Sequence, residues 1–367
     1  MSSPPPRAPV DNIQALRGLA VLLVLFFHLH ELEAHYVAGP RLLPDFTAIG
    51  RCGVDLFFAI SGAVMVISTR GRFGLKRGAW GFILRRALRI YPLYWLFSAL
   101  TLSVFLLPAA AVGPGWADVD LWASFLLWPQ ERAPLLLVGW TLWHELYFYA
   151  AFALFLPGPE ARLPKLLVFW SILTAAAGGA YWTWLDPPVF SPLRVATDPL
   201  TFEFIGGALV GLWWCRGGCR GGGGILLAAG LVLWGLAATV YPAELSASVP
   251  DRWIRVVLLG APALLVLVGA LALERAGTVL PRWLVWTGTA SYSIYLSHLL
   301  VLGVGRRLWM WAVPAGDLGV APLLDLAANA LALLVLAGLC LAAGGASYAL
   351  LERPLHAAAK RLARRLA

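Results

Sequence analysis

The stretch NIQALRGLAVLLVLFFHLH, residues 12–30, decides the fold. It is an apolar run of membrane-spanning length with an arginine near its start and a histidine near its end. The eleven residues from Arg17 to His28 make roughly three helical turns plus 20°, so both side chains leave one face, about 16 Å apart along the axis. Ionisable groups are costly to bury in a bilayer, and this pair therefore marks a candidate functional site.

Apolar runs of this kind recur along the whole chain. Of its 367 residues, 60% are hydrophobic and 13% are charged, which is about half the charged fraction of a soluble domain. The sequence therefore predicts an all-α polytopic membrane protein with about ten transmembrane helices. The expected spans are residues 12–30, 50–68, 90–111, 135–156, 164–184, 199–215, 223–241, 254–273, 283–303 and 323–349.

Basic residues gather on one side of these spans. The predicted loop after the second span holds Arg70, Arg72, Lys76, Arg77, Arg85, Arg86 and Arg89. Cytoplasmic loops carry an excess of Lys and Arg, so we expect both termini in the cytoplasm. The same bias explains the net charge of +9 without a nucleic-acid partner.

The chain divides into one large unit with two short ends. We expect a disordered Pro-rich tail at residues 1–11, a single transmembrane domain at residues 12–354 and a basic cytoplasmic tail at residues 355–367. The four cysteines are dispersed and match no metal spacing, so no metal is expected. The pair Cys215 and Cys219 is interpreted as structural.

Polar groups inside the spans fall at different depths. At 1.5 Å per residue, His28, Asp55 and His298 lie toward the outer face, Glu145 lies near the midplane and Arg17 lies near the inner face. This separation predicts different tasks for Arg17 and His28.

Several polar residues have a structural interpretation as well. We expect Glu203 and His144 to take part in helix packing, and His30 and His35 to be solvated loop histidines. For Asp55, two interpretations stay open: a structural acceptor for a neighbouring helix or for Arg51, or a functional group.

Several motifs occur in the order found in the acyltransferase-3 family of integral membrane acyltransferases. Arg17 followed by His28 resembles the first of them. Later segments of the chain resemble the remaining family motifs: GVDLFFAISG at 53–62, RRALRIYPLYW at 85–95, WTLWHELYFY at 140–149, SYSIYLSH at 291–298 and LERP at 351–354. One departure is Leu146, where many members carry a second glutamate. The resemblance covers almost the whole chain and makes residues 12–354 a single acyltransferase domain.

The resemblance implies transfer of an acyl group, usually acetyl, from cytoplasmic acyl-CoA to a hydroxyl of a carbohydrate or glycoconjugate. It also implies a multi-pass protein of the bacterial inner (plasma) membrane. Arg86 and Arg89, with Arg17, would bind the phosphates of acyl-CoA, because guanidinium groups form charge-assisted, often bidentate hydrogen bonds with phosphate.

In this interpretation, His28 is the general base that takes the proton of the acceptor hydroxyl. Asp55 or Glu145 would fix its tautomer, and His298 and Tyr292 would lie on the acceptor side. Two chemical routes stay open, direct transfer and an acyl-histidine intermediate. Two other functions also stay open: a transporter or flippase of a lipid-linked sugar, and a catalytically silent sensor.

Overall fold

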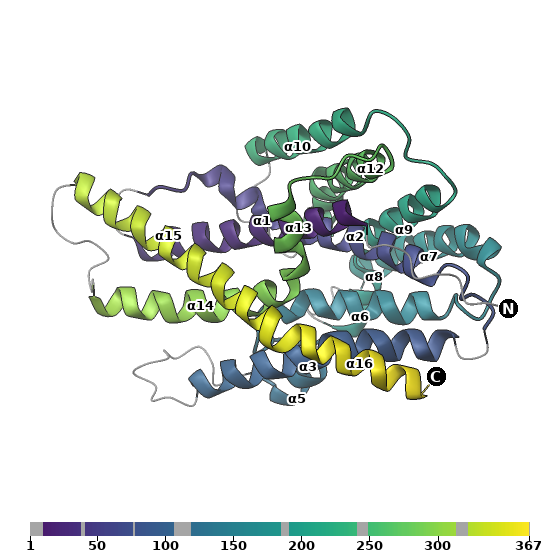
Figure 1. Cartoon of the computed structure of the whole chain (residues 1–367), viewed down its shortest axis with the longest axis horizontal. Helices are drawn as coiled ribbons and strands as arrows, with labels where there is room; N and C mark the ends of the chain where they lie inside the picture. The colour runs from purple at the N-terminus through teal and green to yellow at the C-terminus, as the bar shows by residue number, and fades with distance from the viewer. Residues whose placement is uncertain are drawn as a thin grey trace.

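The computed structural model describes residues 10–37, 41–75, 78–105, 119–184, 191–240, 249–312 and 322–366. Within these ranges every regular element is a helix, which confirms the all-α fold class (Figure 1). The α-helices are α1 (Asp11–Tyr36), α2 (Cys52–Thr69), α3 (Gly78–Phe105), α5 (Leu121–Leu126), α6 (Gly139–Ala153), α7 (Leu163–Trp184), α8 (Pro192–Thr197), α9 (Thr201–Cys215), α10 (Gly223–Val240), α11 (Val249–Arg255), α12 (Ala261–Arg275), α13 (Arg282–Thr289), α14 (Ser291–Ala312), α15 (Pro322–Ser347) and α16 (Arg353–Leu366). Four short elements join them: the 3₁₀ turns η1 (Asp45–Arg51) and η2 (Glu160–Arg162), and the π-helical turns η3 (Val256–Gly260) and η4 (Tyr348–Glu352).

Seven helical segments in the described part of the chain are long and apolar enough to cross a membrane. They are Asp11–His35, Asp45–Thr69, Gly78–Val104, Glu160–Ala180, Gly223–Val240, Asp251–Arg275 and Leu326–Ala359. The protein is therefore a multi-pass membrane protein. The count of about ten spans and the cytoplasmic location of both termini stay predictions.

The predicted third and ninth spans differ from the observed helices. The third helix begins at Gly78, well before the expected start at residue 90, because arginines favour helix yet lower the mean hydropathy by which a span is recognised. The predicted span 283–303 is two helices, because Ala290 leaves the helical conformation with φ −92° and ψ 2°. The helix α13 then packs on α1, at a steep angle to α14 (Figure 1).

The first helix continues beyond its predicted end at residue 30. It runs to Tyr36, so His30 is a buried helical residue and the expectation of a solvated loop was wrong. Glu33 is buried with it, because its carboxylate accepts hydrogen bonds from the backbone N–H groups of Leu42 and Leu43 and from the Asn329 side chain. Burial of a carboxylate is tolerated when its oxygens are bonded in this way.

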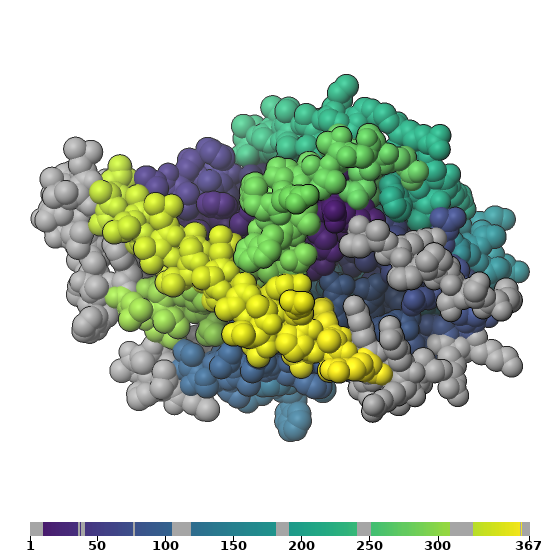
Figure 2. Space-filling model, in the orientation of Figure 1, coloured from purple at the N-terminus to yellow at the C-terminus, as the bar shows by residue number. Residues whose placement is uncertain are grey.

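The chain ends differ from the simple tails expected. Residues 1–9 of the predicted Pro-rich tail lie outside the described residues, and Asp11 already belongs to α1. Residues 76–77 of the predicted basic loop and 106–111 of the predicted third span also lie outside them. The basic C-terminal segment is the helix α16 up to Leu366. Together α15 and α16 cross one face of the molecule diagonally (Figure 2).

Small residues let the central helices approach closely. A Cβ atom on Gly207 of α9 would come within 1.9 Å of the Ala59 carbonyl oxygen of α2, and one on Gly288 of α13 within 1.7 Å of the Gln14 carbonyl oxygen of α1. Close backbone contact through such residues is the usual basis of helix packing in membranes. These contacts hold α1, which carries Arg17 and His28, and α2, which carries Asp55, against their neighbours.

Candidate active site

A cavity of about 90 Å³ lies between α1, α2, α3, α6 and α14. Its charged side chains are Arg17, Arg86, Arg89 and Glu145. All four were predicted from the sequence as site residues, and the fold brings them together from three different helices. Aromatic rings of α2 and α14 complete the wall, among them Phe57, Phe58, Tyr292 and Tyr295.

Arg85, Arg86 and Arg89, which were expected in the loop after the second span, lie on α3 itself. Arg86 and Arg89 are one helical turn apart, so both face the cavity. The Arg86 guanidinium donates to the Ser68 hydroxyl at 3.0 Å and lies 5.3 Å from the Phe82 ring and 5.2 Å from the Tyr149 ring. Such cation–π contacts hold a guanidinium in place without neutralising its charge.

Glu145 is the acidic side chain among these arginines. One of its oxygens accepts hydrogen bonds from the Ser61 hydroxyl at 3.3 Å and from the Tyr149 hydroxyl. Its charge interacts with those of Arg17, Arg86 and Arg89. The cluster therefore keeps an excess of positive charge, as a site for an anionic ligand requires.

The histidine pair lies farther along two of the helices that line the cavity, α1 and α14. Ring centroids of His28 on α1 and His298 on α14 are 4.9 Å apart, and His298 Nε2 lies 3.3 Å from His28 Nδ1. Arg17 precedes His28 by about 16 Å of helical rise, and Tyr292 precedes His298 by about 9 Å. The arginine cavity and the histidine pair are thus separate places joined by α1 and α14.

Hydrogen bonding assigns the protons of the two rings. His298 Nδ1 faces the carbonyl oxygens of Tyr295 at 2.7 Å and Ile294 at 3.2 Å, so this nitrogen carries the proton. His28 Nδ1 lies 2.9 Å from the Val24 carbonyl oxygen and for the same reason is a donor. In neutral rings this leaves His28 Nε2 as the unprotonated nitrogen, the one able to accept a proton.

Tyr295 lies between the cavity and the histidine pair. It lines the cavity, its ring centroid is 5.8 Å from that of His298, and its hydroxyl is 2.8 Å from the Thr141 hydroxyl. Phe57 packs edge-on against it at 5.9 Å. Tyr292, expected beside His298, instead lines the arginine cavity and donates to the Ile90 carbonyl oxygen of α3 at 2.8 Å.

Asp55 is fully buried and paired with Arg255. Two parallel hydrogen bonds of 2.9 Å join its two oxygens to the Arg255 guanidinium. The charge of Glu203, a buried residue of α9, interacts with both partners. Among the described residues, neither Asp55 nor Glu145 hydrogen-bonds to His28, so the tautomer is held by Val24 and His298, and not by a carboxylate.

A second buried ion pair, Asp198 with Arg252, lies beside this one. His144 Nε2 lies 3.3 Å from Asp198 Oδ2, and Arg252 reaches the same oxygen at 3.7 Å. The guanidinium carbons of Arg252 and Arg255 both lie about 6 Å from the Trp140 ring centroid. His144, for which the sequence suggested simple packing, thus takes part in a charged network that ties α6 to α11.

Sequence reasoning missed several site residues. Arg255 and Asp198 carry no local signal, because their partners are distant in the chain. Tyr149 and Tyr295 fall inside the quoted motifs and could have been found as polar positions facing the same side as Glu145 and His298. In the described part of the chain, no group of three or more His, Cys, Asp or Glu side chains is arranged to hold a metal ion.

One family model and two known proteins match the chain over most of its length. The acyltransferase-3 family model, described as an acyltransferase domain, matches residues 10–350. The exopolysaccharide production protein ExoZ of Rhizobium meliloti (strain 1021) is 32% identical over 356 residues, covering 90% of this chain and 94% of that protein. The acyltransferase MdmB of Streptomyces mycarofaciens is 29% identical over 384 residues, covering 96% and 92%. No solved structure matches the chain.

Proposed function

Because the chain belongs to the acyltransferase-3 family, we propose that it transfers an acyl group from cytoplasmic acyl-CoA, most simply acetyl-CoA, to a hydroxyl of a carbohydrate or glycoconjugate. One observation carries this proposal. Helices α1 and α14 line the arginine cavity and, farther along, carry the histidine pair. The reaction needs both an anion-binding site for the donor and a base for the acceptor.

The donor side of the proposal rests on the arginines. Acyl-CoA is made in the cytoplasm and carries several phosphate charges, and guanidinium groups bind phosphate through paired hydrogen bonds. Arg17, Arg86 and Arg89 would hold the donor, with Glu145 keeping the arginines in position in its absence. The acyl thioester would point along α1 and α14 toward Tyr295.

The acceptor side rests on His28. A hydroxyl is a poor nucleophile at neutral pH, and His28 Nε2 would take its proton as the oxygen attacks the thioester carbonyl carbon. When the tetrahedral intermediate collapses, the C–S bond breaks and the imidazolium returns the proton to the CoA thiolate. The products are the O-acyl ester and free CoA, so atoms and protons balance. We propose this direct route in preference to an acyl-histidine, since it needs one transfer step fewer.

The nature of the acceptor rests on the relatives. ExoZ is named as an exopolysaccharide production protein, and MdmB is named as an acyltransferase. A carbohydrate acceptor at the bacterial inner membrane fits the first of these names. The role of Asp55 in this scheme is to hold Arg255, through which it supports the acceptor side indirectly.

The test is acyl transfer by the purified protein in lipid nanodiscs. Radiolabelled acetyl-CoA is supplied with an extract of cell-surface carbohydrate, and label in the carbohydrate fraction is counted. We expect transfer by the wild type and its loss in His28→Ala, with His35→Ala as a control, because His35 is an exposed residue of the same helix. Near-normal transfer by His28→Ala would refute the base assignment. Movement of an unmodified lipid-linked sugar from one leaflet of the bilayer to the other, without any acyl transfer, would favour a flippase.

A further inference from the structure

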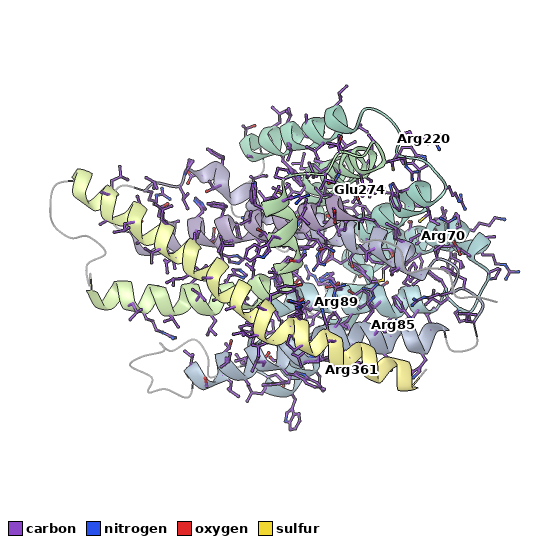
Figure 3. The ribbon with its side chains drawn as sticks, viewed as in Figure 1. Arg70, Arg85, Arg89, Arg220, Glu274 and Arg361 are labelled. Carbon is purple, nitrogen blue, oxygen red and sulfur yellow. The ribbon has the colours of Figure 1, made fainter. Side chains whose placement is uncertain are left out.

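A second cavity, of about 360 Å³, lies outside the first. It is bounded by α1, α3, α13, η4 and α16, and Arg17 and Arg89 line both cavities. Arg85 and Arg89 are four residues apart on α3 and so point to the same side, beside the C-terminal helix (Figure 3). We call the first space the inner cavity and this one the outer cavity; these two names refer to position in the helix bundle and not to the faces of the membrane.

The outer cavity is strongly basic. Three arginines and His356 line it, against one carboxylate, that of Glu352. Glu352 is buried and already accepts a hydrogen bond of 2.6 Å from the Ser293 hydroxyl, and its charge interacts with those of Arg17 and Arg89. Arg85, in contrast, is exposed on the cavity side of α3. The surplus of positive charge indicates a ligand that carries more than one negative charge.

The volumes of the two cavities suit different parts of one molecule. Sites for drug-sized or nucleotide-sized ligands occupy roughly 300–1,000 Å³. The outer cavity reaches that range, whereas the inner cavity, at about 90 Å³, admits only a narrow chain. A donor with a bulky anionic head and a thin arm that ends in the acyl thioester fits this pair of spaces.

We propose that the outer cavity binds the nucleotide head of the donor, an adenosine carrying 3′- and 5′-phosphates, with Arg85 and His356 as phosphate ligands. Arg17 and Arg89, at the boundary, bind the phosphates nearest the arm, and the arm continues into the inner cavity. The C-terminal helix is thus part of the donor site through His356 and Ala359. This proposal rests on the proposed function and adds to it the subsite for the nucleotide.

Binding of adenosine 3′,5′-bisphosphate tests the subsite without requiring turnover. The probe is titrated into the full-length protein in nanodiscs by isothermal calorimetry. We expect saturable binding to the wild type and affinity about 10- to 100-fold lower in Arg85→Gln and in His356→Gln, the loss typical of one charge-assisted hydrogen bond. Arg353→Gln is the matched control, because Arg353 is an exposed basic residue of the same helix outside the cavity lining. No binding to the wild type, or equal affinity in all variants, would overturn the proposal.

A pair of donors separates this subsite from a general loss of structure. Acetyl-CoA and S-acetyl-pantetheine carry the same thioester, but the second lacks the nucleotide. In Arg85→Gln and His356→Gln we expect kcat/KM to fall about tenfold or more with acetyl-CoA and to stay unchanged with S-acetyl-pantetheine. An equal fall with both donors would assign these residues a structural role and refute the subsite. If the wild type bound the nucleotide but transferred no acetyl group from either donor, the proposed function would fail and the subsite would stand.

Discussion

The buried pair of Asp55 and Arg255 allows a quantitative prediction. Asp55 is fully buried, its two hydrogen bonds to Arg255 are both 2.9 Å long, and the Arg255 side chain is 13% exposed. Asp55→Asn keeps the shape but removes the negative charge, which leaves a guanidinium charge inside the bundle. Breaking a buried ion pair by removing one partner costs about 3–5 kcal/mol of unfolding free energy. At about 2 °C for each kcal/mol in a chain of this size, we expect Tm to fall by roughly 6–10 °C.

Glu203 determines whether the fall in Tm lies near the lower or the upper end of this range. Its charge interacts with those of Asp55 and Arg255. With Asp55 neutralised, the Glu203 carboxylate can compensate the Arg255 charge. Asp55→Asn alone is therefore expected near the lower end, and Asp55→Asn combined with Glu203→Gln near the upper end.

The compensating control removes both charges. Replacing the pair by Asp55→Leu and Arg255→Met gives an apolar contact of similar volume, and such replacements of buried ion pairs are often neutral or stabilising. Thermal unfolding in mild detergent, followed by tryptophan fluorescence, measures each variant. Acyl transfer then decides the role of the pair: the double variant stays active if Asp55 and Arg255 only stabilise the bundle, and is stable but inactive if either residue contributes to the reaction. A double variant as unstable as either single one would refute the reasoning.

Three further predictions concern the two levels of the site and the packing around them. His298→Ala removes one of the two acceptors facing His28 Nδ1, so kcat should fall about tenfold, less than the roughly 10²- to 10⁴-fold expected for His28→Ala; an unchanged kcat would contradict the pairing. Arg89→Gln should raise KM for acetyl-CoA about tenfold or more, because Arg89 lines both cavities, and an effect confined to kcat would contradict donor binding. Gly207→Val should lower unfolding free energy by about 1–3 kcal/mol, whereas Gly235→Val, with open space around it, should change it little in the same thermal assay.

Much of the inner cavity could be predicted from the sequence. Arg86 and Arg89 were expected at the inner membrane face, although in a loop, and the depth of Arg17 near the inner end of α1 places it at their level. Periodicity also predicts that His28 and His298 lie toward the same membrane face, and the structure shows their rings in contact. In each case the property that mattered was local, the angle and rise of a single helix.

What the sequence could not provide depends on contacts between distant segments. Asp55 and Arg255 are 200 residues apart, and no local pattern distinguishes this pairing from one with Arg51. The break at Ala290 is a change of backbone direction within an apolar run, to which hydropathy is insensitive. The burial of Glu33 likewise depends on N–H groups supplied by a later turn.

The position of Tyr295 bears on how the two halves of the reaction meet. The donor phosphates need arginines in contact with the aqueous side, whereas the acceptor hydroxyl needs a base shielded from bulk water. In the proposed mechanism the inner cavity separates these requirements, because at about 90 Å³ it admits the acyl arm and excludes the nucleotide. Tyr295 and Phe57 both line this cavity, and Tyr295 lies one helical turn before His298. Because Tyr295 lies between the cavity and the histidine pair, we expect its ring to turn aside when the acyl arm advances toward His28. Hydrolysis of the thioester in the absence of acceptor should therefore be slow, and Tyr295→Ala should raise acetyl-CoA hydrolysis relative to transfer. A hydrolysis-to-transfer ratio unchanged by Tyr295→Ala would show that this ring does not separate the two levels.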